Sequence, residues 1–427
     1  MMGRRNLDIA QIVESGLCHG CGTCAFIQPE EITMVDLPEI GRRPLLSGRD
    51  GRRVDTQAAA SACSGPGYSS VSPQLRPKSA PNQLERVWGP ILEVWEGYAS
   101  DPAVRLAGSS GGVITALSLF ANTKREFSGS VHVTQGAAAM ESEAVFTQDE
   151  ATIRSSAGSR YAPASPGERL TEVARSDGEA VFVGKPCDVA AALKAEGVDG
   201  RLQGKLGLTI SLFCAGTPST AGTVHMLAAM NVSAQEVSAV RYRGNGWPGL
   251  AVAEDGDGQP LGTLTYDESW GKYLQKHRQW RCHVCADHTG ETADISVGDP
   301  WYRPIGDDPG QSLVVVRTER GREFLEGARN SGFVTLVQSP ASIIPESQPH
   351  LERTRGAVFG RVLALRIGGW VAPRFEGMST FPTWWGTLSY RSKVQSIVGT
   401  FRRAHKRGLA RRAPRLWRRE TRSVKQR

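Results

Sequence analysis

Three of the chain's eight cysteines lie close together near its start, in the segment Cys18-His19-Gly20-Cys21-Gly22-Thr23-Cys24. The spacing C-x2-C-x2-C lets one tight loop offer three thiolates to an iron–sulfur cube, and Gly20 and Gly22 supply the backbone freedom that such a loop needs. A zinc knuckle takes two cysteines from one loop rather than three, so the spacing favours iron–sulfur over zinc. The positions of the other five cysteines therefore constrain the fold and the function.

One further cysteine follows within the first 70 residues, and four come much later. Cys63, in Ser61-Ala62-Cys63-Ser64-Gly65-Pro66-Gly67, is the candidate for the fourth ligand of the first loop; a buried free thiol is the alternative. The last four come from three separated segments with a single C-x2-C pair, which fits a zinc ribbon poorly. We expect two clusters that use every thiol: a first set of Cys18, Cys21, Cys24 and Cys63, and a second set of Cys187, Cys214, Cys282 and Cys285.

The 427-residue chain is 40% hydrophobic, enough for one large or two moderate cores. Its longest comparable apolar run, residues 113–121, is too short to span a membrane, and its N-terminus has no apolar signal segment. In such a chain, eight cysteines indicate metal or redox chemistry rather than disulfides. We therefore expect a cytoplasmic protein.

The net charge of +8 is unevenly spread: residues 401–427 carry +11, so the rest of the chain carries −3. Before this basic tail come several aromatic residues and an apolar series at near-helical spacing, Val394, Ile397, Val398 and Phe401. Such a segment suits an anionic membrane surface, here the inner face of a membrane. A disordered solubilising tail is an equal alternative, and nucleic acid is less favoured.

Apolar runs alternate with helix-like stretches between residues 90 and 230, which predicts an α/β body with a central mixed sheet; α+β is the alternative. We expect three parts. Residues 1–86 form a small ferredoxin-like iron–sulfur module, with a hairpin over 32–46 and a linker. Residues 87–345 form the catalytic body, and residues 346–427 form an aromatic and basic extension. Expected strands of the body include 90–98, 131–139, 144–147, 180–183 and 206–213.

A glycine- and serine-rich segment, Gly108-Ser109-Ser110-Gly111-Gly112, precedes the helix expected over residues 113–122. Backbone N–H groups at a helix N-terminus bind anions, which suits the phosphates of a flavin or a nucleotide. A tight turn with a serine cap is the alternative, because the pattern is neither a Rossmann fingerprint nor a P-loop.

Together these motifs resemble the coenzyme F420 hydrogenase/dehydrogenase beta-subunit family of iron–sulfur flavoproteins, from about residue 18 to about 324. The matching segments are 109–113, 158–161, 184–187, 213–214, 243–247, 282–287 and 293–299. The resemblance implies a [4Fe-4S] cluster on the second set, close to an FAD. It also implies that this FAD is held partly by Ser109, Ser110, Gly111 and Gly112 and by the turn of Gly158, Ser159, Arg160 and Tyr161.

Members with an N-terminal cysteine module carry a second cluster. One such branch is similar to the ferredoxin-dependent 7-hydroxymethyl chlorophyll a reductase, and other members accompany polysaccharide biosynthesis genes or deazaflavin-linked enzymes. This chain departs from the family in two places. Residues 26–30 lack the Cys-Pro that many members have there, which leaves Cys63 as the fourth ligand. Lys185 and Asp188 stand where Thr and Gln are expected.

These features predict an oxidoreductase in which electrons enter at the first set, cross to the second set and collect on FAD. The acceptor is coenzyme F420 or another organic substrate, or the path runs in reverse. The expected partner is a ferredoxin-like donor or a redox subunit, and an oligomer is left open. The alternatives are a non-catalytic electron-transfer subunit and a zinc-stabilised binding protein.

Four residues near the C-x2-C pair are candidate proton donors or substrate contacts: His283, Asp287, His288 and Asp299. The alternatives are that His283 covers a cluster and that Asp287 caps the next element. Lys185, Arg241 and Arg243 are candidates to hold an anionic substrate or a flavin phosphate, with surface solvation as the alternative.

Overall fold

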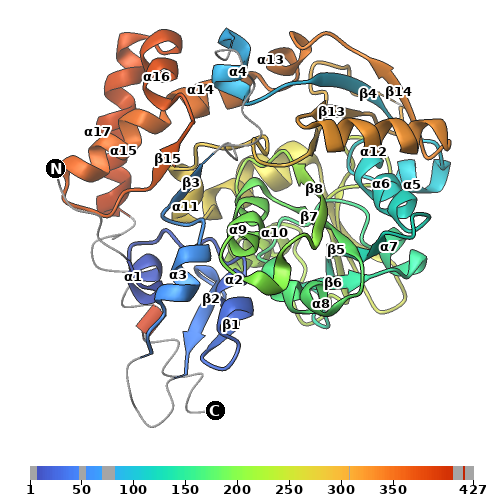
Figure 1. Ribbon diagram of the computed structural model, residues 1–427, viewed down its shortest axis with the longest axis horizontal. Coiled ribbons are helices and arrows are strands. Elements are labelled where there is room, and N and C mark those ends of the chain that lie inside the picture. The colour runs from blue at the N-terminus through green and yellow to red at the C-terminus, as the bar shows by residue number, and fades with distance from the viewer. Residues whose placement is uncertain (1–6, 48–53, 70–81, 307, 407–416, 419–427) are drawn as a thin grey trace.

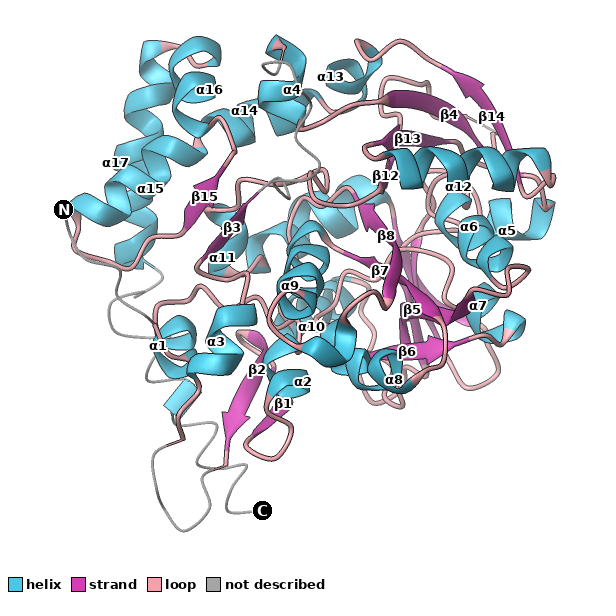
Figure 2. Cartoon of the chain, viewed as in Figure 1, coloured by secondary structure: helices cyan, strands magenta, loops and turns pink. Residues whose placement is uncertain are grey.

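The computed structural model describes residues 7–47, 54–69, 82–306, 308–406 and 417–418. Eight strands form the central sheet: β4 (Glu93–Ala99), β5 (Phe127–Gln135), β6 (Ser142–Thr147), β7 (Glu179–Gly184), β8 (Leu206–Leu212), β12 (Ile295–Gly298), β13 (Ser312–Val316) and β14 (Val334–Gln338). Their order is β14-β4-β13-β12-β8-β7-β5-β6 (Figure 2).

The middle of this sheet is parallel. Strands β12, β8, β7 and β5 run side by side in the same direction, and antiparallel neighbours extend the sheet at both edges. Parallel strands are covered on both faces, which explains why β8 is buried along all but its last residue. The predicted α/β body with a central mixed sheet is confirmed.

Helices cover both faces of the sheet. Alternate residues of β7 separate the two cores: Val181 and Val183 face one, and Ala180 and Phe182 face the other. The helices of the body are α5 (Pro102–Ala107), α6 (Val113–Ala121), α7 (Glu150–Ser155), α8 (Leu170–Arg175), α9 (Pro186–Glu196), α10 (Thr220–Ala229) and α12 (Glu319–Asn330).

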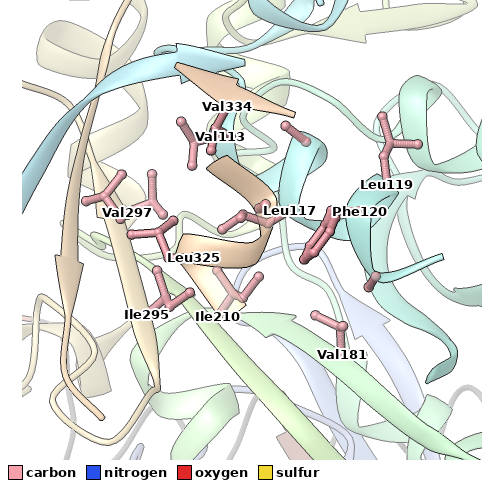
Figure 3. Close-up of a cluster of buried hydrophobic side chains, with 14 of the residues drawn as sticks. Val113, Leu117, Leu119, Phe120, Val181, Ile210, Ile295, Val297, Leu325 and Val334 are labelled. Carbon is pink, nitrogen blue, oxygen red and sulfur yellow. The ribbon is translucent and has the colours of Figure 1, made fainter. Parts of the chain in front are cut away.

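The first core lies on the face of the sheet to which Val181 and Val183 point, and helix α6 lies at its centre. Its residues Val113, Leu117 and Phe120 meet Leu325 of α12 and Ile210 of β8 (Figure 3). Helix α9 packs on the opposite face. The body also contains a three-stranded sheet of β9 (Ala239–Arg241), β10 (Ala251–Glu254) and β11 (Pro260–Leu264). Its short helical segments are η3 (Pro166–Arg169), η4 (Gly200–Leu202), η5 (Asp267–Tyr273), η6 (Leu274–His277) and α11 (Trp280–His283).

The N-terminal module contains the predicted hairpin over residues 32–46. Its elements are α1 (Ile9–Glu14), α2 (Thr23–Ile27), β1 (Ile32–Leu37), β2 (Gly41–Leu46), α3 (Gln57–Ala62), β3 (Gly67–Ser69) and α4 (Gln83–Trp88). Residues 83–86, expected in a linker, begin α4, because Asn82 and Glu85 form a capping box at its start. In the linker expected over 69–86, Ser69 instead ends β3, and residues 70–81 lie outside the described residues.

The C-terminal segment packs on both other parts (Figure 1). It consists of α13 (Ile343–Ser347), α14 (Pro349–Gly356), α15 (Val358–Ile367), β15 (Arg374–Glu376), α16 (Thr380–Thr387) and α17 (Tyr390–Lys406). Strand β15 pairs in parallel with β3, and the indole of Trp417 donates to the carbonyl of Pro44 over 3.1 Å. Among the described residues, every helix is too short or too polar to cross a membrane.

Candidate functional site

The four cysteines of the first set come together in the N-terminal module. The loop of residues 18–24 leads into α2, and Cys63 ends α3. Burial raises the pKa of Cys24, and the neighbouring thiols of Cys21, Cys18 and Cys63 raise it further. Burial and the nearby Cys18 raise the pKa of Cys63 to about 11. Cys18, Cys24 and Cys63 also pack in one hydrophobic cluster of the N-terminal module, which agrees with these mutual effects.

Two glycines shape this loop. Gly20 and Gly22 have φ values of +80° and +85°, in the left-handed region that favours glycine. A Cβ on Gly20 would lie 2.5 Å from the carbonyl oxygen of Arg42, so no side chain fits there. The close approach of the loop to the β1–β2 hairpin therefore depends on Gly20.

The second set gathers at the carboxyl end of the parallel strands. Cys187 lies in the first turn of α9, Cys214 follows β8, and Cys282 and Cys285 lie in and after α11. Burial raises the pKa of Cys214 to about 12, and Cys282 and Cys285 add to this effect. Burial also raises the pKa of Cys187, with contributions from Cys285 and Cys214. Four neighbouring, partly buried thiols are a donor set that fits a [4Fe-4S] cluster, and the first set, in which Cys18 and Cys21 are buried, fits one equally.

A chain of polar contacts through His19, Ser64 and Cys187, called the seam below, connects the two sets. The Nε2 atom of His19 lies 2.7 Å from the hydroxyl of Ser64, which in turn donates to the carbonyl of Cys187 over 2.8 Å. The ligand atoms of His19, Cys187 and Asp188 lie within 4.8 Å of one another. Residues that neighbour the first set thus touch the second set directly.

Lys185, a predicted anion contact, is paired within the protein. Its ammonium lies 2.6 Å from the carboxylate of Asp188, which also accepts from the Lys185 backbone N–H. Burial lowers the pKa of Lys185, but Asp188 and Cys187 raise it more, so the net shift is upward. The two residues that depart from the family pattern are therefore partners of each other.

An inner cavity of about 260 Å³ adjoins the second set. Cys214 lines it, as do the first residues of α6. Gly112, whose φ is +73°, is the N-cap of α6, and no described side chain caps the helix. Its first N–H groups therefore offer a site for an anion, which fits a flavin phosphate. The predicted cofactor residues in the lining are Ser109, Ser110, Gly112, Gly158, Ser159, Arg160, Tyr161 and Lys185.

Gly111, the remaining predicted cofactor contact, is held against the sheet. Its N–H donates to the hydroxyl of Ser312 over 2.9 Å, and a Cβ there would lie 2.5 Å from the carbonyl oxygen of Gly97. Gly111 therefore permits the close packing of the loop on β4 and β13 that aims its neighbours at the cavity.

Arg243 joins the walls of the inner cavity. Only 3% of it is exposed. Its guanidinium donates to both carboxylate oxygens of Asp299, over 2.7 and 3.2 Å, and to the carbonyls of Ser109 and Pro248 over 2.6 and 2.8 Å. The sequence suggested Arg243 only as an anion contact. The structure shows that it ties the glycine-rich loop to the end of β12.

A larger outer cavity of about 1240 Å³ opens beside the inner one. Tyr266, Trp270 and Trp301 line both cavities. The ring centroids of Tyr266 and Trp301 are 4.9 Å apart, and Trp247 and Trp301 are 5.4 Å apart. These aromatic faces suit stacking against a planar ring. Sequence reasoning missed them; the only signal was Trp247, within segment 243–247.

Two of the four predicted catalytic residues face the cavities. His288 lines the outer cavity; its Nδ1 lies 2.8 Å from the carbonyl of Cys214, and its buried Nε2 has no partner among the described residues. Burial lowers the pKa of His288 to about 4. Asp299 lines the inner cavity, where it accepts from Arg243 and from the indole of Trp247 over 2.9 Å.

The other two stabilise the turn around the second set. The carboxylate of Asp287 accepts three backbone N–H groups, from residues 289, 290 and 291, over 2.7 to 3.0 Å. The carbonyl of His283 accepts from Arg361 of α15 over 2.8 Å, and its ring lies 6.0 Å from that of Trp280. The contacts of Asp287 match the capping alternative, and those of His283 connect α11 with α15.

Two family models match the chain and together span more than half of it. Both describe the beta subunit of coenzyme F420 hydrogenase/dehydrogenase. Residues 94–171 match the model of its N-terminal part, and residues 177–341 match the model of its C-terminal part.

Individual proteins share this similarity at low identity. The F420-dependent formate dehydrogenase 1 subunit beta of Methanococcus maripaludis is 26% identical over 59% of this chain and 63% of its own length. The coenzyme F420 hydrogenase subunit beta of Methanosarcina barkeri is 25% identical over 55% of this chain and 78% of its own. A chain of the F420-reducing [NiFe] hydrogenase complex from Methanosarcina barkeri shares the fold, with a TM-score of 0.53 and 21% identity, over 67% of this chain and 96% of that one.

Proposed function

Because this chain belongs to the coenzyme F420 hydrogenase/dehydrogenase beta-subunit family, we propose that it is an iron–sulfur flavoprotein oxidoreductase. It passes electrons between a one-electron carrier of the ferredoxin type and a two-electron acceptor, coenzyme F420 or another organic molecule. One observation carries the proposal: two adjacent groups of four thiols, each buried or partly buried, lead to a cavity at the start of α6.

In this proposal each cysteine set would hold one [4Fe-4S] cluster, and the cavity-lining residues together with the first N–H groups of α6 would hold FAD and its phosphate. When bound, the clusters supply single-electron steps and the flavin converts them to two-electron chemistry. The protein positions these groups. Gly112 leaves the N–H groups of α6 free for the phosphate, Arg243 fixes the loop that carries them, and the aromatic rings of the outer cavity offer faces for a planar ring. His288 is the catalytic candidate best placed to contact a substrate there.

Cofactor analysis of the anaerobically purified full chain tests the proposal. We expect flavin absorption and about eight irons per chain. Cys63→Ala removes the first cluster and Cys214→Ala the second, each leaving about four irons, while Ser61→Ala, an exposed neighbour of Cys63, changes nothing. A colourless preparation with bound zinc contradicts the proposal. If Cys63→Ala retains both clusters, the fourth ligand of the first set is assigned wrongly.

A turnover assay separates an enzyme from a non-catalytic electron-transfer subunit, including one that serves polysaccharide biosynthesis. The loaded protein is mixed with reduced ferredoxin and coenzyme F420, and the deazaflavin absorbance is followed. Reduction of coenzyme F420 by the isolated chain supports the enzyme. Cluster and flavin reduction without any loss of the deazaflavin absorbance supports a subunit role, in agreement with the two relatives described above, which are named as subunits.

We further propose that the outer face of α16 and α17 binds the anionic inner surface of a membrane. Tyr390, Val394 and Val398 form a stripe along α17, exposed by 82%, 43% and 43%. Lys393 lies 4.5 Å from the ring centroid of the exposed Trp385 of α16. Neither helix contains an acidic residue. Aromatic and aliphatic side chains beside cations suit a lipid interface.

Vesicle co-sedimentation of the full chain tests this surface. We expect binding to vesicles of phosphatidylcholine with phosphatidylserine, weaker binding to phosphatidylcholine alone, and a loss with Trp385→Ser combined with Val394→Ser. Val198→Ser, at an exposed valine on another surface, is the control. Equal sedimentation of the double variant and the unmodified chain contradicts the proposal.

A further inference from the structure

Arg281 is the largest of the fully buried side chains, with 1% of its surface exposed. It lies on α11, one residue before Cys282. Its Nε donates to the carbonyl of Gly65 over 2.8 Å and its Nη2 to the carbonyl of Ser64 over 3.4 Å, so it holds the loop after Cys63. Its Nη1 is buried and has no partner among the described residues.

The charge of Arg281 reaches both cysteine sets. Arg281 is the direct sequence neighbour of Cys282 in the second set, and its hydrogen bonds to Ser64 and Gly65 place it beside Cys63 of the first set. The groups that raise the pKa of Arg281 itself are Cys285, Tyr68, Cys187 and Cys282, and none of them is a carboxylate. Its guanidinium also lies 5.1 Å from the ring centroid of Phe375, so an aromatic ring, thiols and a phenol are near this cation, where a buried arginine normally has an acidic partner.

Arg317 shows what a purely structural buried arginine looks like in this protein. It is 5% exposed, and its guanidinium donates to the hydroxyl of Ser296 and to the carbonyls of Trp88, Pro90 and Thr289 over 2.7 to 2.9 Å. Arg281 bonds two carbonyls only and keeps one buried donor unused. A cluster-bound thiolate is an acceptor for such a donor, and hydrogen bonds of this kind tune cluster potentials.

We propose that Arg281 is a positioning residue that serves both clusters, holding the Cys63 loop against the second set and raising the reduction potential of each cluster. This inference rests on the proposed function. In the step concerned, one electron leaves the first cluster, which is oxidised, and reduces the second; no bond forms or breaks. A fixed positive charge in a buried, low-dielectric site favours the reduced, more negative state of both partners.

Potentiometric titration of the full, cluster-loaded chain, followed by electron paramagnetic resonance, tests the proposal. We expect Arg281→Met to lower the reduction equilibrium constant of both clusters at least tenfold, which is about 59 mV for a one-electron couple. Arg281→Lys retains the charge and should therefore keep both reduction potentials close to those of the unmodified chain. Arg329→Met, which removes an exposed charge on α12, leaves both potentials unchanged. Arg281→Gln provides the neutral variant if the methionine variant does not fold.

The outcomes separate this inference from the proposed function. Unmodified protein without two clusters refutes both. Two clusters whose potentials are the same in the unmodified chain and in the neutral variant refute the role of Arg281 and leave the proposed function intact. A shift confined to one cluster refutes the shared role. Equal shifts in the neutral and lysine variants show a structural effect instead of a charge effect, and also overturn the proposal.

Discussion

The removal of Arg243 is the perturbation whose effect follows most directly from the structure. This guanidinium is 3% exposed and binds Asp299, the glycine-rich loop at Ser109 and the carbonyl of Pro248. Arg243→Met preserves most of the side-chain volume but leaves the carboxylate of Asp299 with the indole of Trp247 as its remaining donor among the described residues. The variant therefore tests whether this ion pair stabilises the cavity wall.

The expected cost is about 3–5 kcal/mol, because the removal of one partner leaves the other charge in a poorly solvated place. Arg241 provides the matched control two residues away. Its side chain is 30% exposed, and its ion pair with Glu254 is 3.4 Å long. Since such pairs contribute about 0–1 kcal/mol, Arg241→Met is expected to be nearly neutral. Arg243→Met with Asp299→Asn should cost less than the sum of the single changes, because the two groups interact.

The thermal unfolding midpoint of each cofactor-loaded variant, measured without oxygen at one scan rate, ranks the stabilities of the variants and the unmodified chain. The flavin retained after gel filtration reports the glycine-rich loop. We expect Arg243→Met to lose several degrees and most of its flavin, and Arg241→Met to retain both. Equal midpoints and equal flavin content in the two variants would refute the role of Arg243.

Three further perturbations have calculable effects. Burial lowers the pKa of His132 to about 4, so between pH 6.5 and pH 4 the unfolded chain binds a proton that the folded chain does not. The contribution of this histidine to the free energy of unfolding is therefore complete above pH 6.5 and falls by about 2 kcal/mol between pH 7 and pH 5. This fall should vanish in His132→Asn when thermal midpoints are compared across that range. Gly112→Ala should cost at least about 1 kcal/mol and weaken flavin binding, because Gly112 has a φ of +73° and a Cβ there would lie 2.5 Å from the Val104 carbonyl oxygen; Gly200→Ala, with no atom within 4 Å, is the control for denaturant titration. Leu117→Ala in the first core should cost about 2–5 kcal/mol in the same titration, and a loss below about 1 kcal/mol would contradict its place in that core.

Periodicity predicted the elements that are local. The hairpin over 32–46 and strands β7 and β8 follow from short apolar runs bounded by turn residues, and the structure places them within a few residues of the predicted bounds. The pairing of β15 with β3 is different, because it joins segments about 300 residues apart that are three residues long. Such pairs have no periodic signal, and the sequence therefore made the C-terminal segment look like a separate extension.

The site shows the same division between local and distant information. The motif 282–288 placed Asp287 and His288 together as catalytic candidates, but they are adjacent residues with opposite surroundings. Asp287 accepts from three backbone N–H groups of its own turn, and His288 reaches the outer cavity. Only the path of the turn decides which side chain faces the cavity, and composition does not encode that path. The aromatic wall of Tyr266, Trp270 and Trp301 was missed for a related reason, since its rings meet across two separate segments.

The electrostatics of the seam connect cofactor binding with folding. Arg43, Lys185 and Arg281 are buried beside the thiols, and Asp188 is paired with only one of them, Lys185. With neutral thiols, this region would carry surplus buried positive charge, which is costly in a medium of low dielectric constant. Cysteine-bound clusters supply negative charge at the same place. The cations that position the two sets are therefore stabilised by the clusters that those sets would bind, and in the proposed function cluster assembly contributes to the stability of the fold.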